Sequence, residues 1–408
     1  MNKKFVGAVA LSLFFQVSAF AQFGGFGGPQ GGGSVPDADK TADVNYVGDG
    51  KTYHTLDIYI PKQAKESYPV VIHTYGSAWS SNNMKGSADL STICAAYAKA
   101  GYAVVTPNHR SASDAKYPAQ LHDIKAVVRF VRGNAAKYKF DTNFVAVSGF
   151  SSGGHLSSLT ATTCGLKEGK SGSVTVDLVG DLGEYTSFSS CVDGAVLWSP
   201  PTDIYTMNPI SMGGSGTMEG AFIGVEREGN KDKWMVASSP YYASDDDPPV
   251  IMFHGTSDNI VNIEQSQELY DSLKNHNVVT EFVKVSGGSH GGDKMNSSEN
   301  LAKAVAFLDQ AREAKAAAAV VPSDTSKQDT SKVDTSKTDT LPPDTETIAI
   351  HSLRVPMLAP VSYSVYSLDG TLVMRSSVLD KSRLKAGVYY VVSKYNTGER
   401  KMSRFVKK

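Results

Sequence analysis

The chain of 408 residues has little net charge and few cysteines. Its 40 lysines and arginines nearly balance its 41 aspartates and glutamates, so we expect no nucleic-acid partner and no charge-driven binding to a membrane surface. The apolar run from Phe5 to Phe15 is too short to span a bilayer. No cluster of His, Cys and Asp has the spacing of a tight metal site, so the sequence predicts no metal and no other cofactor and disfavours a metal-dependent deacetylase.

The N-terminus has the pattern of a processing signal. Lys3 and Lys4 precede the apolar run, and Ala19-Phe20-Ala21 fits the small-residue cleavage rule. Residues 1–21 are therefore a predicted signal peptide, and the mature protein is expected to be secreted, extracellular or on the outer cell surface, with no integral membrane segment. No cysteine lies near the cleavage site, so no lipid anchor is expected there.

The three cysteines have different surroundings. Cys94 lies in an apolar helical pattern, which is typical of a buried free thiol. Cys164 and Cys191 bracket a polar, Gly-rich loop, and export would permit a disulfide. Such a bond would contribute roughly 3 kcal/mol in the chain-entropy model. The sequence leaves the pairing open.

Composition divides the mature chain into four parts. We expect a Gly-rich leader over 22–42, an α/β domain over 43–319, a linker over 320–347 and a small β module over 348–408. Strands that alternate with helices predict a mainly parallel sheet with helices on both faces. The expected strands of the α/β domain are 44–47, 53–60, 69–74, 103–106, 144–147, 194–198, 250–254 and 281–285, and the expected helices are 90–100, 121–136, 264–274 and 300–318.

The last two parts have simple patterns. In the linker an aspartate recurs every five residues, from Asp324 to Asp344, within an Asp-Thr-Ser-Lys-like repeat that has almost nothing to bury. The C-terminal module alternates like short strands, with turn signals such as Asp369-Gly370, and it ends in basic residues. It contains no catalytic cluster.

A short motif at 149–153 is the strongest candidate for chemistry. Gly149-x-Ser151-x-Gly153 follows an apolar strand pattern and precedes a helix-like segment, which is the context of a nucleophile elbow. Small residues are needed there because the strand and helix backbones approach closely. Alone, the motif could be an ordinary Gly/Ser-rich loop, so the other catalytic groups decide its meaning.

Those groups follow in the expected order. An elbow serine needs a base to take its proton and a carboxylate to orient that base, and in α/β-hydrolases the order along the chain is Ser, acid, His. Asp258 follows the predicted strand 250–254, and His290 lies on a Gly-rich loop after the strand 281–285. The sequence therefore predicts a catalytic triad of Ser151, Asp258 and His290. We interpret His254 as support for the acid loop and His155 as a helix residue that packs or hydrogen-bonds behind the elbow.

An oxyanion hole is expected beside Ser151. One donor is the backbone N–H of Ser152, at the start of a helix whose dipole favours an anion. The second is expected in the loop 75–79, at Gly76 or Ser77. Selection among esters is expected around Trp79, as a substrate-binding residue, and in the long segment 199–247, which is typical of a lid or a binding wall.

With these residues in place, the sequence resembles the esterase/lipase-like α/β-hydrolases, over roughly 44–316. The matching motifs are Tyr75-Gly76-Ser77-Ala78-Trp79, where many relatives have His-Gly-Gly-Gly-Trp, then Asn108-His109-Arg110, Tyr117-Pro118-Ala119 with Asp123, the elbow through His155, Pro200-Pro201-Thr202-Asp203, and Pro248-Pro249 through Asp258. The resemblance is to the secreted bacterial group that includes acetylxylan and feruloyl esterases. Arg110 and Asp123 resemble a structural ion pair in relatives. The departures are Tyr75, Ser77 and Ala78 in the oxyanion loop.

The resemblance implies a secreted serine esterase that forms an acyl-enzyme on Ser151. Its expected partners are plant cell-wall polysaccharide esters, with acetyl or feruloyl groups on hemicellulose (xylan), or small ester substrates. The alternatives are a broad carboxylesterase or lipase-like enzyme and a prolyl-type peptidase, which the lack of propeller-like repeats before the domain disfavours. A non-catalytic binding protein is disfavoured by the intact triad. The C-terminal module resembles the sorting domains of secreted Gram-negative proteins, which would make the secretion machinery a partner, and a carbohydrate-binding module is the alternative.

Overall fold

The computed structural model describes residues 33–212, 216–320, 362–367, 372–376, 387–394 and 400–407. The chain divides into two compact units, Met1–Val320 and Val321–Lys408. The predicted signal peptide and linker lie outside the described residues. None of the helices within the described ranges is long and apolar enough to cross a membrane.

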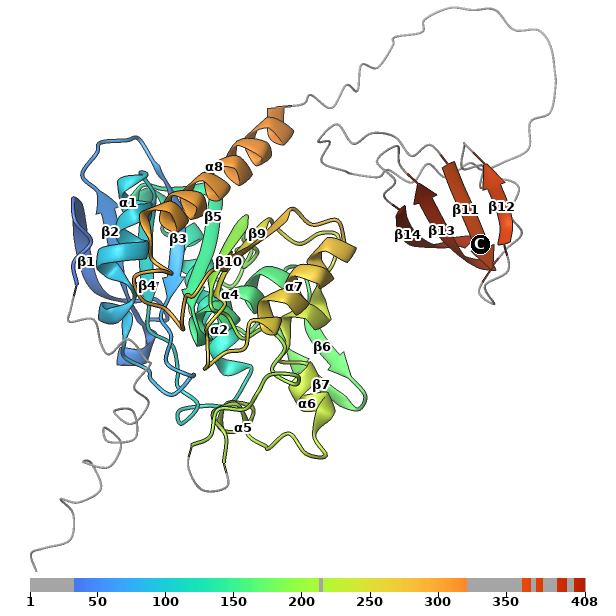
Figure 1. Ribbon diagram of the computed structural model, residues 1–408. Helices are drawn as coiled ribbons and strands as arrows, with labels where there is room; N and C mark the ends of the chain where they lie inside the picture. Colours follow the sequence, from blue (N-terminus) through green and yellow to red (C-terminus); the bar gives the residue numbers. More distant parts are fainter. Residues whose placement is uncertain are drawn as a thin grey trace, which may run out of the picture. The chain divides into compact units, whose positions relative to one another are not determined.

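The first unit is built on one eight-stranded sheet (Figure 1). Its spatial order is β1-β2-β4-β3-β5-β8-β9-β10. The six strands from β4 to β10 are parallel, whereas β1 and β2 are antiparallel at one edge. The bounds are β1 (Ala38–Asn45), β2 (Thr55–Pro61), β3 (Tyr68–Thr74), β4 (Ala103–Pro107), β5 (Phe140–Phe150), β8 (Gly194–Trp198), β9 (Val250–Gly255) and β10 (Thr280–Val285). The predicted mainly parallel α/β architecture is confirmed.

Helices cover both faces of this sheet (Figure 1). Successive strand residues point to opposite sides, and apolar residues on both sides need to be buried. In β3, Val70 and Ile72 belong to the core that includes residues of α2 (Ala119–Gly133) and α7 (Glu264–Asn275). Val71 belongs to the core on the other face, with residues of α1 (Ala95–Lys99) and α8 (Ser298–Val320). Each face is therefore apolar and packed, and the strands read as continuous hydrophobic runs. The helices are α1 (Ala95–Lys99), which continues a π-helical turn over Leu90–Cys94, α2 (Ala119–Gly133), α3 (Ala135–Tyr138), α4 (Ser152–Thr162), α5 (Met218–Ile223), α6 (Lys231–Met235), α7 (Glu264–Asn275) and α8 (Ser298–Val320).

Two features differ from the sequence-based prediction. The expected leader extends to residue 42, but β1 already begins at Ala38. This edge strand is mostly exposed and is held by backbone pairing with β2, so it carries no apolar pattern. In addition, β6 (Glu168–Ser171) and β7 (Val174–Asp177) form an antiparallel hairpin inside the segment between Cys164 and Cys191, which the sequence predicted to be a polar, Gly-rich loop.

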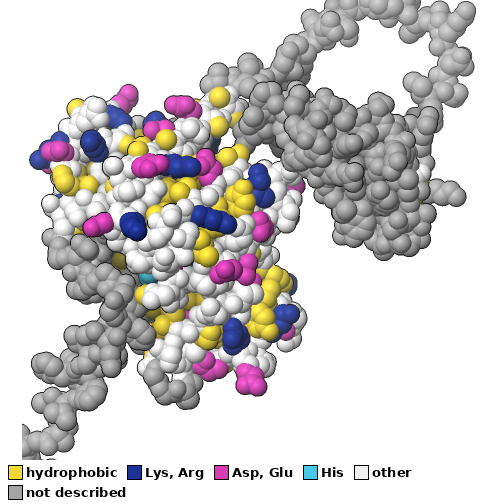
Figure 2. All heavy atoms as spheres, viewed as in Figure 1, with side chains coloured by type: hydrophobic (Ala, Val, Ile, Leu, Met, Phe, Trp, Pro, Cys, Tyr) yellow, Lys and Arg dark blue, Asp and Glu magenta, His cyan; other side chains and the backbone are white. Residues whose placement is uncertain are grey.

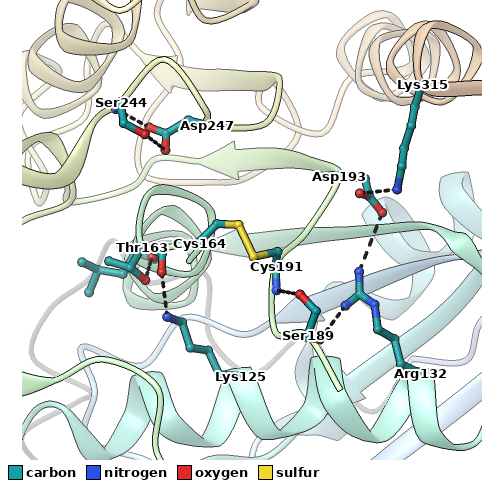
Figure 3. Close-up of a disulfide and its surroundings, with 11 residues drawn as sticks. Lys125, Arg132, Thr163, Cys164, Ser189, Cys191, Asp193, Ser244, Asp247 and Lys315 are labelled. Atoms are coloured by element: carbon teal, nitrogen blue, oxygen red, sulfur yellow. Dashed lines mark hydrogen bonds and ion pairs between the residues drawn. A yellow bond between two sulfur atoms is a disulfide. The ribbon is translucent and has the colours of Figure 1, made fainter. Parts of the chain in front are cut away.

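A disulfide between Cys164 and Cys191 closes the segment that contains this hairpin (Figure 3). Beside it, Lys125 of α2 donates from Nζ to the carbonyl of Thr163, the residue after α4, at 3.0 Å. The Lys125 side chain is 1% exposed. The disulfide that the sequence left open is formed, and its Cys164 lies just after the C-terminal end of α4, the helix that begins at the elbow. Cys94 is a buried free thiol, as predicted.

The second unit contains a four-stranded antiparallel sheet in the order β12-β11-β13-β14. Its strands are β11 (Ser362–Ser367), β12 (Leu372–Ser376), β13 (Gly387–Lys394) and β14 (Arg400–Lys407). Val365 is fully buried in this sheet and Val373 is about half exposed. The arrangement agrees with the alternating pattern of the C-terminal module.

Candidate active site

Ser151 lies on a strained turn between β5 and α4. Its backbone has φ 52° and ψ −124°, which a non-glycine residue rarely adopts. The glycines beside it allow the close approach: a Cβ on Gly153 would overlap the carbonyl oxygens of Thr74 and Tyr75, and one on Gly149 would overlap the carbonyl of Gly153. The motif therefore forms the predicted strand–turn–helix elbow, with Ser151 at its apex.

The structure brings the three predicted catalytic side chains together. His290 Nε2 lies 2.8 Å from Ser151 Oγ, and His290 Nδ1 lies 2.8 Å from Asp258 Oδ2. Ser151 and His290 are 4% and 3% exposed. Since a carboxylate only accepts, Nδ1 carries the proton toward Asp258, and Nε2 is left to accept the Ser151 hydroxyl proton. This is the geometry that general-base activation of a serine requires.

Asp258 is fixed by four donors. The N–H groups of Ile260 and Val261 each donate to Oδ1 at 3.0 Å, while His290 donates to Oδ2. His254 Nε2 lies 3.3 Å from the same Oδ2. Burial by itself would raise the pKa of Asp258, but the hydrogen bonds from His254 and His290 hold that pKa well below its ordinary value. The acid is therefore ionised at neutral pH, and its donors fix its orientation.

His254 supports this loop from the end of β9, as predicted. The ring is fully buried, with Nδ1 2.7 Å from Ser266 Oγ and Nε2 2.9 Å from the Val261 carbonyl. Nε2 must carry the proton to donate to that carbonyl. The same N–H then also faces Oδ2 of Asp258, so a second histidine stabilises the carboxylate.

The predicted oxyanion donors surround Ser151 in an arrangement that differs in one detail. A Cβ on Gly76 would lie 2.8 Å from Ser151 Cβ, so this glycine is directly beside the nucleophile. Ser152 is the first residue of α4, where N–H groups point out of the helix. The N–H of Ser77, however, donates to Ser152 Oγ at 2.9 Å. Ser77 thus holds the loop against α4 through its N–H, so the candidate oxyanion donors are the N–H groups of Gly76 and Ser152.

Trp79 is placed differently from the prediction. Its side chain is 1% exposed, stacks on Phe222 with 4.8 Å between ring centroids, and donates from Nε1 to His155 Nδ1 at 3.2 Å. In this conformation the indole has no surface for a substrate. The sequence predicted a substrate-binding role for Trp79 because it does not reveal that Phe222, from the segment 199–247, covers the ring.

The described residues of the segment 199–247 follow the carboxyl end of β8 and pack beside α4. Gln265 of α7 anchors its start, because Gln265 Oε1 accepts from the N–H groups of Thr202 and Asp203 at 2.8 and 2.9 Å. Further along, Phe222 and Trp234 are buried in the cluster that also contains Trp79. The predicted binding wall is thus a packed structure that contacts α4 and the loop 75–79.

Comparisons with known proteins agree with this fold. A family model described as BD-FAE matches residues 56–273, more than half of the chain. A solved structure described as a truncated carbohydrate esterase from gut microbiota is 38% identical, with a TM-score of 0.66, over 69% of this chain and 99% of that one. A structure described as bifunctional GH43-CE from Bacteroides eggerthii is 41% identical, with a TM-score of 0.64, over 67% of this chain and 35% of that one.

Curated relatives are more distant. The probable carboxylic ester hydrolase LipM of Mycobacterium tuberculosis is 26% identical over 57% of this chain and 51% of its own length. Esterase LipC of the same species is 26% identical over 61% of this chain and 60% of its own length. The chain thus spans about half to three fifths of these relatives. The fold and the site define an α/β-hydrolase. Within that class, the chain belongs to the BD-FAE family.

Proposed function

We propose that this protein is a serine esterase that hydrolyses carboxylic esters through an acyl-enzyme on Ser151. The observation that carries the proposal is the unbroken hydrogen-bonded chain from Ser151 through His290 to Asp258, with 2.8 Å at each step. The strained elbow presents Ser151 at its apex, and the flanking N–H groups of Gly76 and Ser152 form an oxyanion hole that stabilises the charge on the carbonyl oxygen. Esterases among the relatives and structural neighbours support the same reaction class.

Each step of the reaction has a residue of this chain. His290 Nε2 takes the hydroxyl proton as Ser151 Oγ attacks the ester carbonyl, and Asp258 stabilises the imidazolium that results. The N–H groups of Gly76 and Ser152 hold the tetrahedral oxyanion. His290 then protonates the leaving alcohol oxygen, which leaves the acyl group on Ser151. Water attacks that ester by the same proton path in reverse, releasing the acid and restoring the hydroxyl.

Acetyl or feruloyl esters on hemicellulose are the substrate class we favour. Support comes from the carbohydrate esterase and GH43-CE descriptions of the two similar structures, with 38% and 41% identity. On the face seen in Figure 2, lysines and arginines are interspersed with aspartates and glutamates. Mixed charge of this kind suits an uncharged polysaccharide better than a nucleic acid. A broad carboxylesterase is the second candidate, since LipM and LipC bear that class of description.

Secretion is part of the proposal. The N-terminal pattern of residues 1–21 directs export, and the module 348–408 directs sorting at the outer surface or binds carbohydrate. Comparing the location of activity in cells that express the full chain or a deletion of 348–408 tests the sorting role. Activity that remains at the same location after the deletion contradicts it, and lost retention on insoluble xylan favours carbohydrate binding.

Hydrolysis of p-nitrophenyl acetate by the wild type and by Ser151→Ala tests the reaction class. We expect the variant to lose all hydrolysis above background, and equal rates for the two proteins would refute a serine esterase. Release of acetate or ferulate from native xylan then identifies the acyl group. Activity on small esters without release of either acid would favour the broad carboxylesterase.

A further inference from the structure

The loop 75–79, called the oxyanion loop below, has a conformation that needs outside support. Ala78 and Trp79 are both left-handed, with φ of 47° and 57°. This conformation is unfavourable for a non-glycine residue and persists only where the surroundings enforce it. The N–H that would stabilise an oxyanion, on Gly76, lies two residues before this turn, so relaxation of the turn would move it.

One buried histidine makes the contact that holds Trp79. His155 is fully buried in α4, four residues after Ser151. Its Nδ1 accepts from Trp79 Nε1 at 3.2 Å, and its Nε2 lies 2.8 Å from the Ala237 carbonyl. Indole N–H and carbonyl groups have fixed roles, so the ring must be neutral with its proton on Nε2. Burial lowers the pKa of His155 to about 4, which keeps this tautomer at neutral pH.

Phe222 completes the arrangement from the segment 199–247. Its ring stacks on Trp79 at 4.8 Å and meets the His155 ring edge-on at 5.6 Å. The oxyanion loop, the nucleophile helix and the segment 199–247 therefore meet at one buried contact. Ala237, the acceptor for His155, belongs to the same segment.

From these contacts we infer that His155 is a positioning residue of the oxyanion site, which couples the oxyanion loop to the segment 199–247. It holds Trp79 on one side and Ala237 on the other. His155 touches no reacting atom and transfers no proton. Its effect reaches the reaction through the position of the Gly76 N–H. This inference rests on the proposed esterase function.

The test compares His155→Leu, which removes both bonds, with His155→Gln, whose amide keeps a donor and an acceptor, and with Trp79→Phe, which removes only the indole N–H. His54→Gln is the matched control, since His54 is also buried and hydrogen-bonded, to Asp49, but lies outside the site. Steady-state kinetics on p-nitrophenyl acetate, melting temperature and the inhibition constant of phenylboronic acid are measured for each. The boronate places a tetrahedral oxygen where the oxyanion forms.

We expect His155→Leu to lower kcat by roughly 10- to 100-fold with KM little changed, because a small displacement of a catalytic group has effects of this size. The inhibition constant of phenylboronic acid should rise by a similar factor. Trp79→Phe should lower kcat by about 3- to 10-fold, the effect expected from the loss of one hydrogen bond. The kcat of His155→Gln should lie between those of His155→Leu and wild type. The control should lower the melting temperature without changing the inhibition constant.

Two outcomes would overturn the inference alone. One is a folded His155→Leu or Trp79→Phe variant with wild-type kcat and boronate inhibition. The other is a ¹⁵N NMR spectrum in which His155 is charged or carries its proton on Nδ1 at neutral pH. By contrast, a wild type without Ser151-dependent hydrolysis would refute the proposed function itself and the inference with it, while the NMR result would still report the tautomer.

Discussion

Replacing Asp258 with asparagine should disable the enzyme by fixing His290 in the wrong tautomer. The backbone N–H groups of Ile260 and Val261 donate to Oδ1 at 3.0 Å, and only the oxygen of the new amide can accept them. The amide NH₂ must then replace Oδ2, 2.8 Å from His290 Nδ1. There it donates to Nδ1 and drives the proton to Nε2, which can no longer accept from Ser151.

The expected loss is large. A triad histidine held in the wrong tautomer lowers kcat by roughly 10,000-fold, which corresponds to about 5.5 kcal/mol of activation free energy. The assay is kcat/KM on p-nitrophenyl acetate, with Ser151→Ala as the floor. Asp247→Asn is the matched control, because this half-buried carboxylate is also hydrogen-bonded, to Ser244 (Figure 3), and is not part of the triad. It should keep wild-type activity. Asp258→Asn activity within about tenfold of wild type would refute the reasoning.

The same substitution should change the response to acid. Because the folded-state pKa of Asp258 is lowered, its ionisation stabilises the fold above about pH 4, the unfolded-state pKa, and this contribution is lost as the pH falls toward the folded-state pKa. The free energy of unfolding of wild type should therefore exceed that of Asp258→Asn by less at about pH 3 than at about pH 6. Urea denaturation at both pH values measures the two differences, and an equal difference would contradict this assignment.

Three further substitutions test the frame around the site. Gly153→Ala should abolish activity and lower the melting temperature, because the new Cβ overlaps the Thr74 carbonyl at the end of β3; a variant like wild type would contradict the close packing. Burial lowers the pKa of Lys125 to about 7, so Lys125→Met should be more stable relative to wild type at about pH 6 than at about pH 10, and urea denaturation showing no such trend would contradict the burial. Joint replacement of Cys164 and Cys191 by serine, which opens a loop with a sequence separation of 27, should cost roughly 3.5 kcal/mol of unfolding free energy, and unchanged stability would contradict it.

Most strands of the sheet and the three triad residues were predictable, because local sequence patterns determine them. The expected strand 194–198 coincides with β8, a fully buried run whose five residues are all apolar or glycine. Asp258 and His290 were identified by their order after the strands β9 and β10, since parallel strands bring the loops at their carboxyl ends to one edge of the sheet. The strand-to-helix change at Gly149-x-Ser151-x-Gly153 likewise needs only neighbouring residues.

The errors arise where structure depends on distant partners. The strand β1 has an exposed face and forms because β2 supplies backbone partners, so its residues resemble a leader. The Ser77 N–H is taken by a hydroxyl 75 residues away, on Ser152. No periodicity or motif reports that pairing. Trp79 was predicted to bind substrate, but it is buried against Phe222, a residue much later in the chain that no local pattern connects to it.

The placement of His155 limits how substrate selection can work in this fold. Its partners Trp79 and Ala237 lie 76 and 82 residues away along the chain, in the oxyanion loop and in the segment 199–247. A substitution in that segment that shifts Ala237 or Phe222 must also move the support of the strained turn at Ala78 and Trp79. On the proposed function, in which this segment also contacts the ester, substitutions introduced there should alter kcat together with KM.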